Sequence, residues 1–242
     1  MRIFLAGAAG AIGRRLVPLL VAAGHAVTGT TRSGETASEL RSRGVTAVVL
    51  DVFDAGALTD AVVRARPDVV IHQLTDLPKM LDRVRPPGGF AGNTRLRVEG
   101  TPNLVAAALA ARARRLIAQS IAFAYAPGRE PHAETDPLAS AEGDSSHAVT
   151  ARGVRALEGA VLGAAGLTGI VLRYGRLWGP GTWNPTPNGR GVLHVDAAAH
   201  AALLALTRGS AGVYNIAEAD GAVTTDKAQR DLGFNPAFRL PA

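Results

Sequence analysis

The sequence contains no cysteine, and this absence excludes disulfide bonds, thiolate metal sites and cysteine nucleophiles. Lysine is scarce, so the formal net charge of +6 comes almost entirely from arginine. Because the arginines are dispersed and no nucleic-acid motif accompanies them, we expect no nucleic-acid partner. The positive charge is compatible with anionic ligands.

The sequence also lacks an apolar run long enough to cross a bilayer, and Arg2 leads straight into a predicted strand without a signal peptide. We therefore expect a cytoplasmic protein with no membrane partner. Of the 242 residues, 47% are hydrophobic and 19% are charged, which suffices to bury one good core but not two large domains. The resulting expectation is a single domain, 1–242.

Three glycines near the start of the chain carry the strongest functional signal. In RIFLAGAAGAIGRRL an apolar strand leads into Gly7, Gly10 and Gly13, and an amphipathic helix follows directly. Gly7 permits a tight turn, Gly10 lets the backbone approach a pyrophosphate, and Gly13 lets the helix close on the strand. Free N–H groups at the helix N-terminus then face the anion. The segment predicts a dinucleotide site; the alternative is a strand-to-helix turn with no ligand.

Short apolar runs alternate with helical segments along the first two thirds of the chain. This alternation predicts a Rossmann-type doubly wound α/β sheet whose parallel strands are covered on both faces. After the first strand, the predicted strands are His25–Thr31, Val45–Leu50, Asp68–Leu74, Arg114–Ser120 and Thr168–Arg173, and the predicted helices are Ile12–Ala23, Glu35–Arg43, Ala55–Arg66, Asn93–Ala110 and His147–Ala165. RPPGG at Arg85–Gly89 predicts a mobile loop.

The last part of the chain is expected to be small. Residues 1–175 should form mainly the dinucleotide-binding core, and 176–242 mainly a region that covers the substrate. His194 and Asp196 have no third ligand at metal spacing, so we expect no metal site. Asp196 is instead predicted to cap an alanine-rich helix. Gly212–Glu218 reads as another strand, and a final helix, Thr224–Leu232, should end at Gly233.

The end of the second predicted strand bears on the choice of cofactor. Thr31 and Arg32 stand where a carboxylate would bind the ribose 2′-OH of NAD, and this pair leaves room for a 2′-phosphate. We therefore expect NADP(H) in preference to NAD(H). Asp51 could bind the adenine amine or cap a helix. The predicted cofactor contacts are Gly7, Gly10, Ala11, Ile12, Gly13, Thr31, Arg32, Asp51, Val52, Gln73, Leu74, Thr75 and Tyr174.

These segments resemble the extended short-chain dehydrogenase/reductase superfamily, of the NAD-dependent epimerase/dehydratase type. GAAGAIG, LDVFD, VEGTPNL, RLIAQS, LRYGRLWGPGT and HVD carry the resemblance, which spans nearly the whole chain. It implies a sheet order of 3-2-1-4-5-6 with a seventh strand, and a small C-terminal part over the carboxyl ends of the strands. Nucleotide-sugar enzymes of the family have a longer C-terminal part, so a bulky nucleotide-sugar substrate is disfavoured.

The family's chemistry depends on a tetrad of Asn, Ser or Thr, Tyr and Lys, and the resemblance places none of the four here. Arg97 stands at the Asn position, and the hydroxyl position falls on Ile121. Counting back from the helix glutamate Glu158, Thr150 replaces Tyr and Val154 replaces Lys. A threonine hydroxyl is far too weak an acid for the Tyr role, and valine supplies no charge to lower a pKa. The sequence therefore predicts an atypical member of the family.

Ser120, Tyr125 and Thr150 are the candidates for a replacement proton relay. Ser120 could polarise a carbonyl or cap its loop, and Tyr125 could donate a proton or simply pack. The indoles of the loop WGPGTWNPTPNGRG, 178–191, could form a pocket wall or serve as core or subunit contacts. The predicted substrate contacts are His72, Arg97, His147, Trp178, Trp183 and Arg190.

Three functions stay open at this point. The first is an NADP(H)-dependent oxidoreductase that acts on a small or medium carbonyl or alcohol through an atypical proton relay. The second is a non-redox isomerase, dehydratase or cyclase, and the third is a non-enzymatic binder that senses NADP. Since helices at 93–110 and 147–165 commonly pair two subunits in relatives, a homodimer is a further hypothesis.

Overall fold

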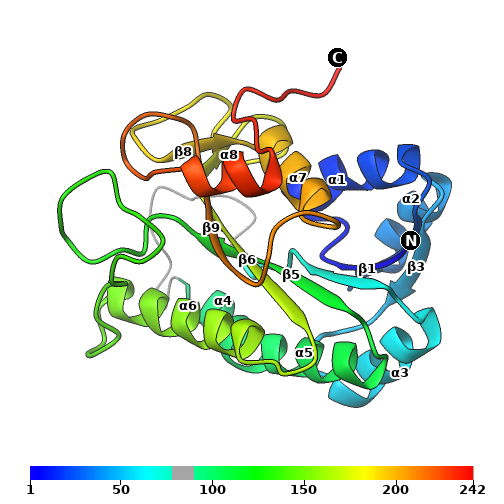
Figure 1. Ribbon diagram of the computed structural model, residues 1–242. Helices are drawn as coiled ribbons and strands as arrows, with labels where there is room; N and C mark the ends of the chain where they lie inside the picture. The colour runs from blue at the N-terminus through cyan, green and yellow to red at the C-terminus, as the bar shows by residue number, and fades with distance from the viewer. Residues whose placement is uncertain (78–89, 242) are drawn as a thin grey trace.

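The computed structural model describes residues 1–77 and 90–241, and a seven-stranded sheet lies at its centre (Figure 1). The strands are β1 (Arg2–Ala6), β2 (Ala26–Thr31), β3 (Thr46–Val49), β4 (Val69–His72), β5 (Arg115–Ile121), β6 (Thr168–Tyr174) and β9 (Gly212–Ile216). Their order is β3-β2-β1-β4-β5-β6-β9, and all six pairings are parallel. This confirms the predicted Rossmann-type sheet and its strand order.

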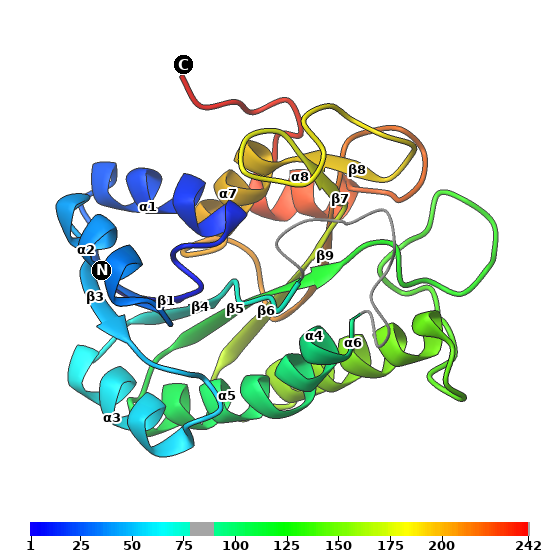
Figure 2. The ribbon, with the colours of Figure 1, turned by 180° about the vertical axis from the view of Figure 1, so that it is seen from behind.

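Two hydrophobic clusters cover the two faces of the sheet. In β1, Ile3 and Leu5 join one cluster and Phe4 joins the other, because successive strand side chains point to opposite faces. Figures 1 and 2 show helices over both faces. One layer holds α1 (Ala11–Ala22), α2 (Gly34–Ser42), α7 (Val195–Leu204) and α8 (Asp226–Leu232), and the other holds α3 (Ala55–Ala65), α4 (Ala91–Arg95), α5 (Thr101–Ala110) and α6 (Ser146–Leu162).

The helix predicted at 93–110 is interrupted. Between α4 and α5 lies a π-helical turn, η1 (Leu96–Gly100). Pro102 stands at the start of α5, where its missing N–H removes one helical hydrogen bond. Within this turn Arg97 is buried, with 5% of its surface exposed. Single π-helical turns are frequent at functional sites, so the interruption directs attention to Arg97.

The chain after β6 forms a second, small sheet. β7 (Arg176–Trp178) pairs in parallel with β8 (Val192–His194), so the ends of the predicted loop at 178–191 are held together. Helix α7 follows directly, and its N-cap is His194; the prediction that Asp196 caps it was wrong. The Asp196 carboxylate is buried and forms an ion pair with Arg15 of α1, which ties the two helices together.

The C-terminal helix ends as predicted, because Gly233 takes the left-handed conformation with φ of +73°. The loop predicted at Arg85–Gly89 lies outside the described residues. Among 1–77 and 90–241, no helix is both long enough and apolar enough to span a membrane.

Candidate functional site

The turn between β1 and α1 leaves no room for side chains at two of its glycines. A Cβ atom on Gly13 would lie 2.2 Å from the Gly7 carbonyl oxygen. Gly7 has φ of +92°, and a Cβ there would lie 2.5 Å from the carbonyl oxygen of Gln73. Internal packing therefore requires both glycines. The turn also brings the end of β4 directly against the end of β1.

Gly10 differs, because protein packing does not require a glycine there. The nearest atom to a Cβ on Gly10 would be 3.5 Å away, an ordinary contact, and its φ is −72°. Gly10 is the N-cap of α1, with no side-chain cap and no acidic residue in the first turn. Helix N–H groups at Ala11 and Ile12 thus remain available to an anion. This arrangement fits the pyrophosphate of a dinucleotide.

Polar residues lie beyond the ends of β2 and β3. Arg32 is mostly exposed, and its guanidinium lies 3.4 Å from the Asp76 carboxylate. Thr31 accepts a hydrogen bond from the backbone of Ser33, which caps α2. Asp51 accepts the N–H of Phe53 at 3.0 Å. The N-cap of α3 is Asp54, so the alternative that Asp51 caps this helix was wrong.

The contacts near β4 are more enclosed. The Val52 side chain is buried, and its carbonyl oxygen accepts a hydrogen bond from Asn103. Gln73 donates to the hydroxyl of buried Tyr174 at 3.2 Å, and its own buried Oε1 has no hydrogen-bond partner among the residues that the structure describes. Burial raises the pKa of Tyr174 despite the Gln73 hydrogen bond. Leu74 is half-buried and Thr75 is exposed.

The residues that the resemblance aligns with the family's tetrad make contacts within the protein that do not serve proton transfer. The Thr150 hydroxyl donates to the Ser146 carbonyl at 2.7 Å, within its own helix. Val154, at the lysine position, is fully buried in the core. Ile121 has no polar group to offer. Among the described residues, none of these three positions presents an acid or a cation.

A buried polar network instead joins the ends of β5, β6 and α6. The Glu158 carboxylate accepts two hydrogen bonds from Arg173, at 2.9 and 2.7 Å, and one from Ser120 at 2.7 Å. Arg173 also donates to the hydroxyl of Tyr125, which in turn donates to Asn215 at 2.6 Å. The sequence predicted that Ser120 and Tyr125 lie at this strand end. It did not predict that Glu158 and Arg173 connect them, because these two residues lie in later segments of the chain.

The surroundings of Arg173 and Tyr125 fix the protonation state of both side chains. Burial opposes the Arg173 charge, but hydrogen bonds and the attraction of Glu158 outweigh burial and raise the pKa of Arg173. Burial likewise raises the pKa of Tyr125, although Arg173 opposes that shift. Tyr125 is therefore a neutral phenol whose single proton is directed at Asn215.

His72 is the last residue of β4, and it lies close enough to Arg97 to be affected by its charge. His72 is fully buried; its Nε2 lies 3.0 Å from the Thr101 hydroxyl and its Nδ1 accepts the N–H of Leu74. Burial and the Arg97 charge lower its pKa to about 4, so the ring is neutral. Burial, opposed by Glu158, lowers the pKa of Arg97 to about 10, so Arg97 stays cationic.

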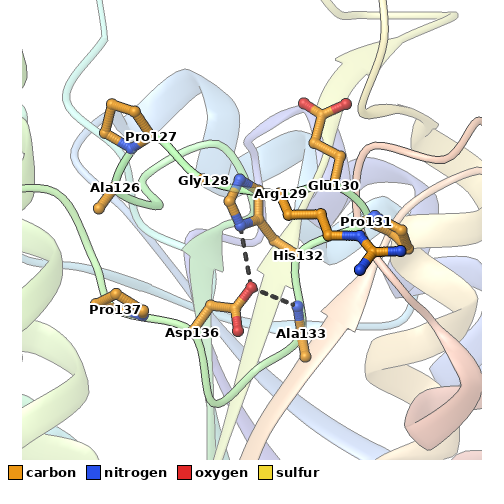
Figure 3. A pocket seen from close by; sticks show the side chains of 10 residues that line it. All are labelled: Ala126, Pro127, Gly128, Arg129, Glu130, Pro131, His132, Ala133, Asp136 and Pro137. Atoms are coloured by element: carbon orange, nitrogen blue, oxygen red, sulfur yellow. Dashed lines mark hydrogen bonds and ion pairs between the residues drawn. The ribbon is translucent and has the colours of Figure 1, made fainter.

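A pocket of about 520 Å³ lies in the segment after β5 (Figure 3). His132 and Asp136 point toward each other across it, 3.1 Å apart, and the His132 ring stacks on Tyr125. No residue of the glycine turn or of β4 lines it. It is lined by Ala126, Pro127, Gly128, Arg129, Glu130, Pro131, His132, Ala133, Asp136 and Pro137.

The remaining predicted substrate residues are dispersed. Trp178 donates to Glu218 at 2.9 Å and meets the His194 ring edge-on. Trp183 and His147 are exposed, and Arg190 forms an ion pair with Glu130.

A model of the NAD dependent epimerase/dehydratase family matches residues 3–194. The chain is 42% identical to a 3-diazoavenalumate denitrifying reductase from Streptomyces sp., a match that covers 100% of this chain and 85% of the relative.

Two solved structures share the fold. UDP-glucose 4-epimerase with UDP-glucose from Thermotoga maritima aligns with a TM-score of 0.80 and 20% identity, covering 99% of this chain and 94% of the other. The Bordetella bronchiseptica enzyme WbmG in complex with NAD aligns with a TM-score of 0.76 and 19% identity, covering 99% and 90%.

Proposed function

We propose that this chain, which belongs to the NAD dependent epimerase/dehydratase family, is a nicotinamide-dependent reductase whose reaction takes no proton from a tyrosine. The observation that carries the proposal is a glycine turn that fits a dinucleotide beside tetrad positions that have lost their acid and its lysine. The Thr150 hydroxyl donates its hydrogen bond to a backbone carbonyl of α6, and the Val154 side chain is buried in the core. Neither residue can protonate a substrate oxygen.

A reaction that consumes a hydride without a proton suits such a site. The similar Streptomyces protein is named for the denitrifying reduction of a diazo compound. When an arenediazonium ion gains one hydride, the hydride pair forms a C–H bond and the C–N pair leaves on dinitrogen, so no proton is needed. A bound nicotinamide cofactor would supply the hydride and be oxidised by two electrons. We therefore propose a diazo-substituted aromatic compound as the substrate class.

Reduction of a small or medium carbonyl is the second candidate, and it requires a replacement proton donor. Ser120 in β5 and Tyr125 just after it are the candidate donors. The Ser120 proton is directed at Glu158 and the Tyr125 proton at Asn215. Because both protons have acceptors inside the protein, this arrangement favours the reaction that consumes none.

We propose NADP(H) as the preferred cofactor, with Arg32 paired to its 2′-phosphate. The supporting observation is that Arg32 is mostly exposed and holds only an ion pair of 3.4 Å with Asp76. An exposed ion pair of this kind contributes little free energy, so a phosphate dianion can replace the Asp76 carboxylate as the partner of Arg32.

We also propose that two copies pair through α5 and α6, whose outer surfaces expose Leu109 and Leu162. Light scattering at the mass of a single chain would exclude this pairing.

The test of the reaction uses 4-carboxybenzenediazonium as substrate and a nicotinamide cofactor deuterated at C4. We expect protein-dependent loss of the nicotinamide absorbance, release of dinitrogen, and one deuterium in the benzoate product. The control is Gly10→Ala, which keeps the fold but blocks the approach of the pyrophosphate. No acceleration over the uncatalysed rate, or hydrogen that comes from solvent, would overturn the proposal. Faster turnover of 4-carboxybenzaldehyde would favour the carbonyl candidate.

A further inference from the structure

We propose that Arg97 binds an anionic oxygen of the substrate, a carboxylate or a phenolate, and thereby selects a negatively charged substrate. This inference rests on the proposed reductase function, because it names the class of molecule that the same site accepts.

The first observation is that Arg97 is a buried residue whose guanidinium has no hydrogen-bond acceptor within 1–77 and 90–241. It has 5% of its surface exposed, and no group among the described residues accepts a hydrogen bond from its guanidinium. Other enclosed arginines are satisfied: Arg173 binds Glu158 and Tyr125, and Arg115 donates to three backbone carbonyls. An enclosed cation without a partner is costly unless a ligand supplies one.

The second observation is the local balance of charge. Glu158 is the carboxylate that attracts Arg97, but its oxygens already accept hydrogen bonds from Arg173 and Ser120. His72 beside Arg97 is neutral, and the half-buried Glu134 accepts the N–H of Asn215 instead. In the described part of the chain, two buried guanidinium groups therefore share one buried carboxylate. The unmatched positive charge calls for an anion.

The third observation is that the helices leave space for this side chain. Arg97 lies on the π-helical turn η1 and faces Gly153 of α6. A Cβ atom added at Gly153 would lie 3.3 Å from the Arg97 Cδ, so the glycine leaves room for this side chain. Its neighbours His72 and Glu158 place it at the carboxyl edge of the sheet, where ligands bind in open α/β folds. A guanidinium there presents a planar set of donors that matches a carboxylate in two hydrogen bonds and a phenolate in one or two.

The test measures binding of benzoate, 4-nitrophenolate and neutral benzamide to the NADP⁺-saturated protein by calorimetry. In Arg97→Met we expect the affinity for at least one anion to fall by about tenfold or more, while benzamide binding is unchanged. Which anion loses affinity shows whether a carboxylate or a phenolate is recognised. The matched control is Arg95→Met, an exposed arginine two residues earlier, which should change nothing.

Stability separates a ligand-binding role from a structural one. If Arg97 serves a ligand, Arg97→Met should have a melting temperature without substrate equal to or above that of the wild type, since it removes an unpaired buried charge. A lower melting temperature with unchanged affinities would overturn the inference, and so would absence of anion binding to the wild type. Failure of both NADP⁺ and NAD⁺ to bind would instead refute the proposed function. Deuteride transfer to a diazonium probe with no effect of Arg97→Met would refute the inference alone.

Discussion

The glycine turn and the two α6 positions that the resemblance aligns with the tyrosine and lysine differ in how tightly the protein around them restricts the side chain. At the turn, Gly7 and Gly13 are held by backbone atoms that exclude any Cβ. At the tetrad, Thr150 and Val154 are accommodated without strain by a helical hydrogen bond and by the core. Backbone contacts fix the cofactor end, whereas the chemistry depended on side chains that could be exchanged. Under the proposed function, the chain binds the cofactor although these positions supply no proton donor.

The largest expected effect concerns the buried polar network of Glu158, Arg173, Ser120 and Tyr125. Arg173→Met should lower the free energy of unfolding by about 3–5 kcal/mol, because it leaves the buried Glu158 carboxylate without its ion-pair partner. Chemical denaturation of the wild type and the variant measures this. A loss below about 1 kcal/mol would mean that the network is not structural. The contrast with Arg97→Met, a buried arginine with no such partner, sharpens the result.

At the glycine turn, two alanine substitutions should separate packing from binding. Gly13→Ala should destabilise the protein by about 3 kcal/mol, since its Cβ would overlap backbone oxygens. Gly10→Ala should cost at most about 1 kcal/mol, because an N-cap alanine is somewhat unfavourable but no atom blocks it. Its affinity for NADPH should nevertheless fall by at least about tenfold. Unfolding curves measure the two stabilities, and calorimetry measures the affinity for NADPH. Wild-type affinity in Gly10→Ala would contradict a role of Gly10 in cofactor binding.

The pH dependence of stability tests the burial of His72. Its pKa is about 4 in the folded protein against 6.5 in the unfolded chain, so between these values the unfolded chain binds more protons. Stability should therefore rise with pH in this window and be lost as the pH falls. From pH 7 to pH 5 we expect His72 to account for a loss of about 2 kcal/mol. His72→Gln should remove this contribution to the pH dependence of the free energy of unfolding. If the wild type and the variant lost stability equally between pH 7 and pH 5, His72 would not be its source.

The smallest effect concerns the end of β2. Arg32→Ala should weaken NADPH binding by about tenfold through the lost phosphate contact and leave NADH binding unchanged. Arg64→Ala serves as the control, because it removes an exposed arginine in the last turn of α3 that belongs to no predicted site. Calorimetry with both nucleotides decides the matter. Equal weakening of NADPH and NADH would show that Arg32 supports the fold of the loop and does not read the phosphate.

Several features of the fold were predictable because they depend on neighbours in the chain. The apolar runs, the spacing of Gly7, Gly10 and Gly13, and the helix end at Gly233 each express a local backbone preference. The alternation of apolar runs and helical segments predicted the parallel sheet, and the family resemblance implied its order. The cap of α7 was mispredicted at Asp196 because the ion pair with Arg15, 181 positions away, engages its carboxylate.

What the sequence alone determined is the sheet, the glycine turn and the absence of a tyrosine and a lysine where the family uses them. Only the tertiary structure decided what fills that absence. Glu158, Arg173, Ser120 and Tyr125 come from separate segments and meet because β5, β6 and α6 pack together. Arg97 differs from other arginines in the sequence only once the π-helical turn encloses it beside a neutral His72. Burial, partners and net local charge are properties of a folded neighbourhood, and no linear spacing encodes them.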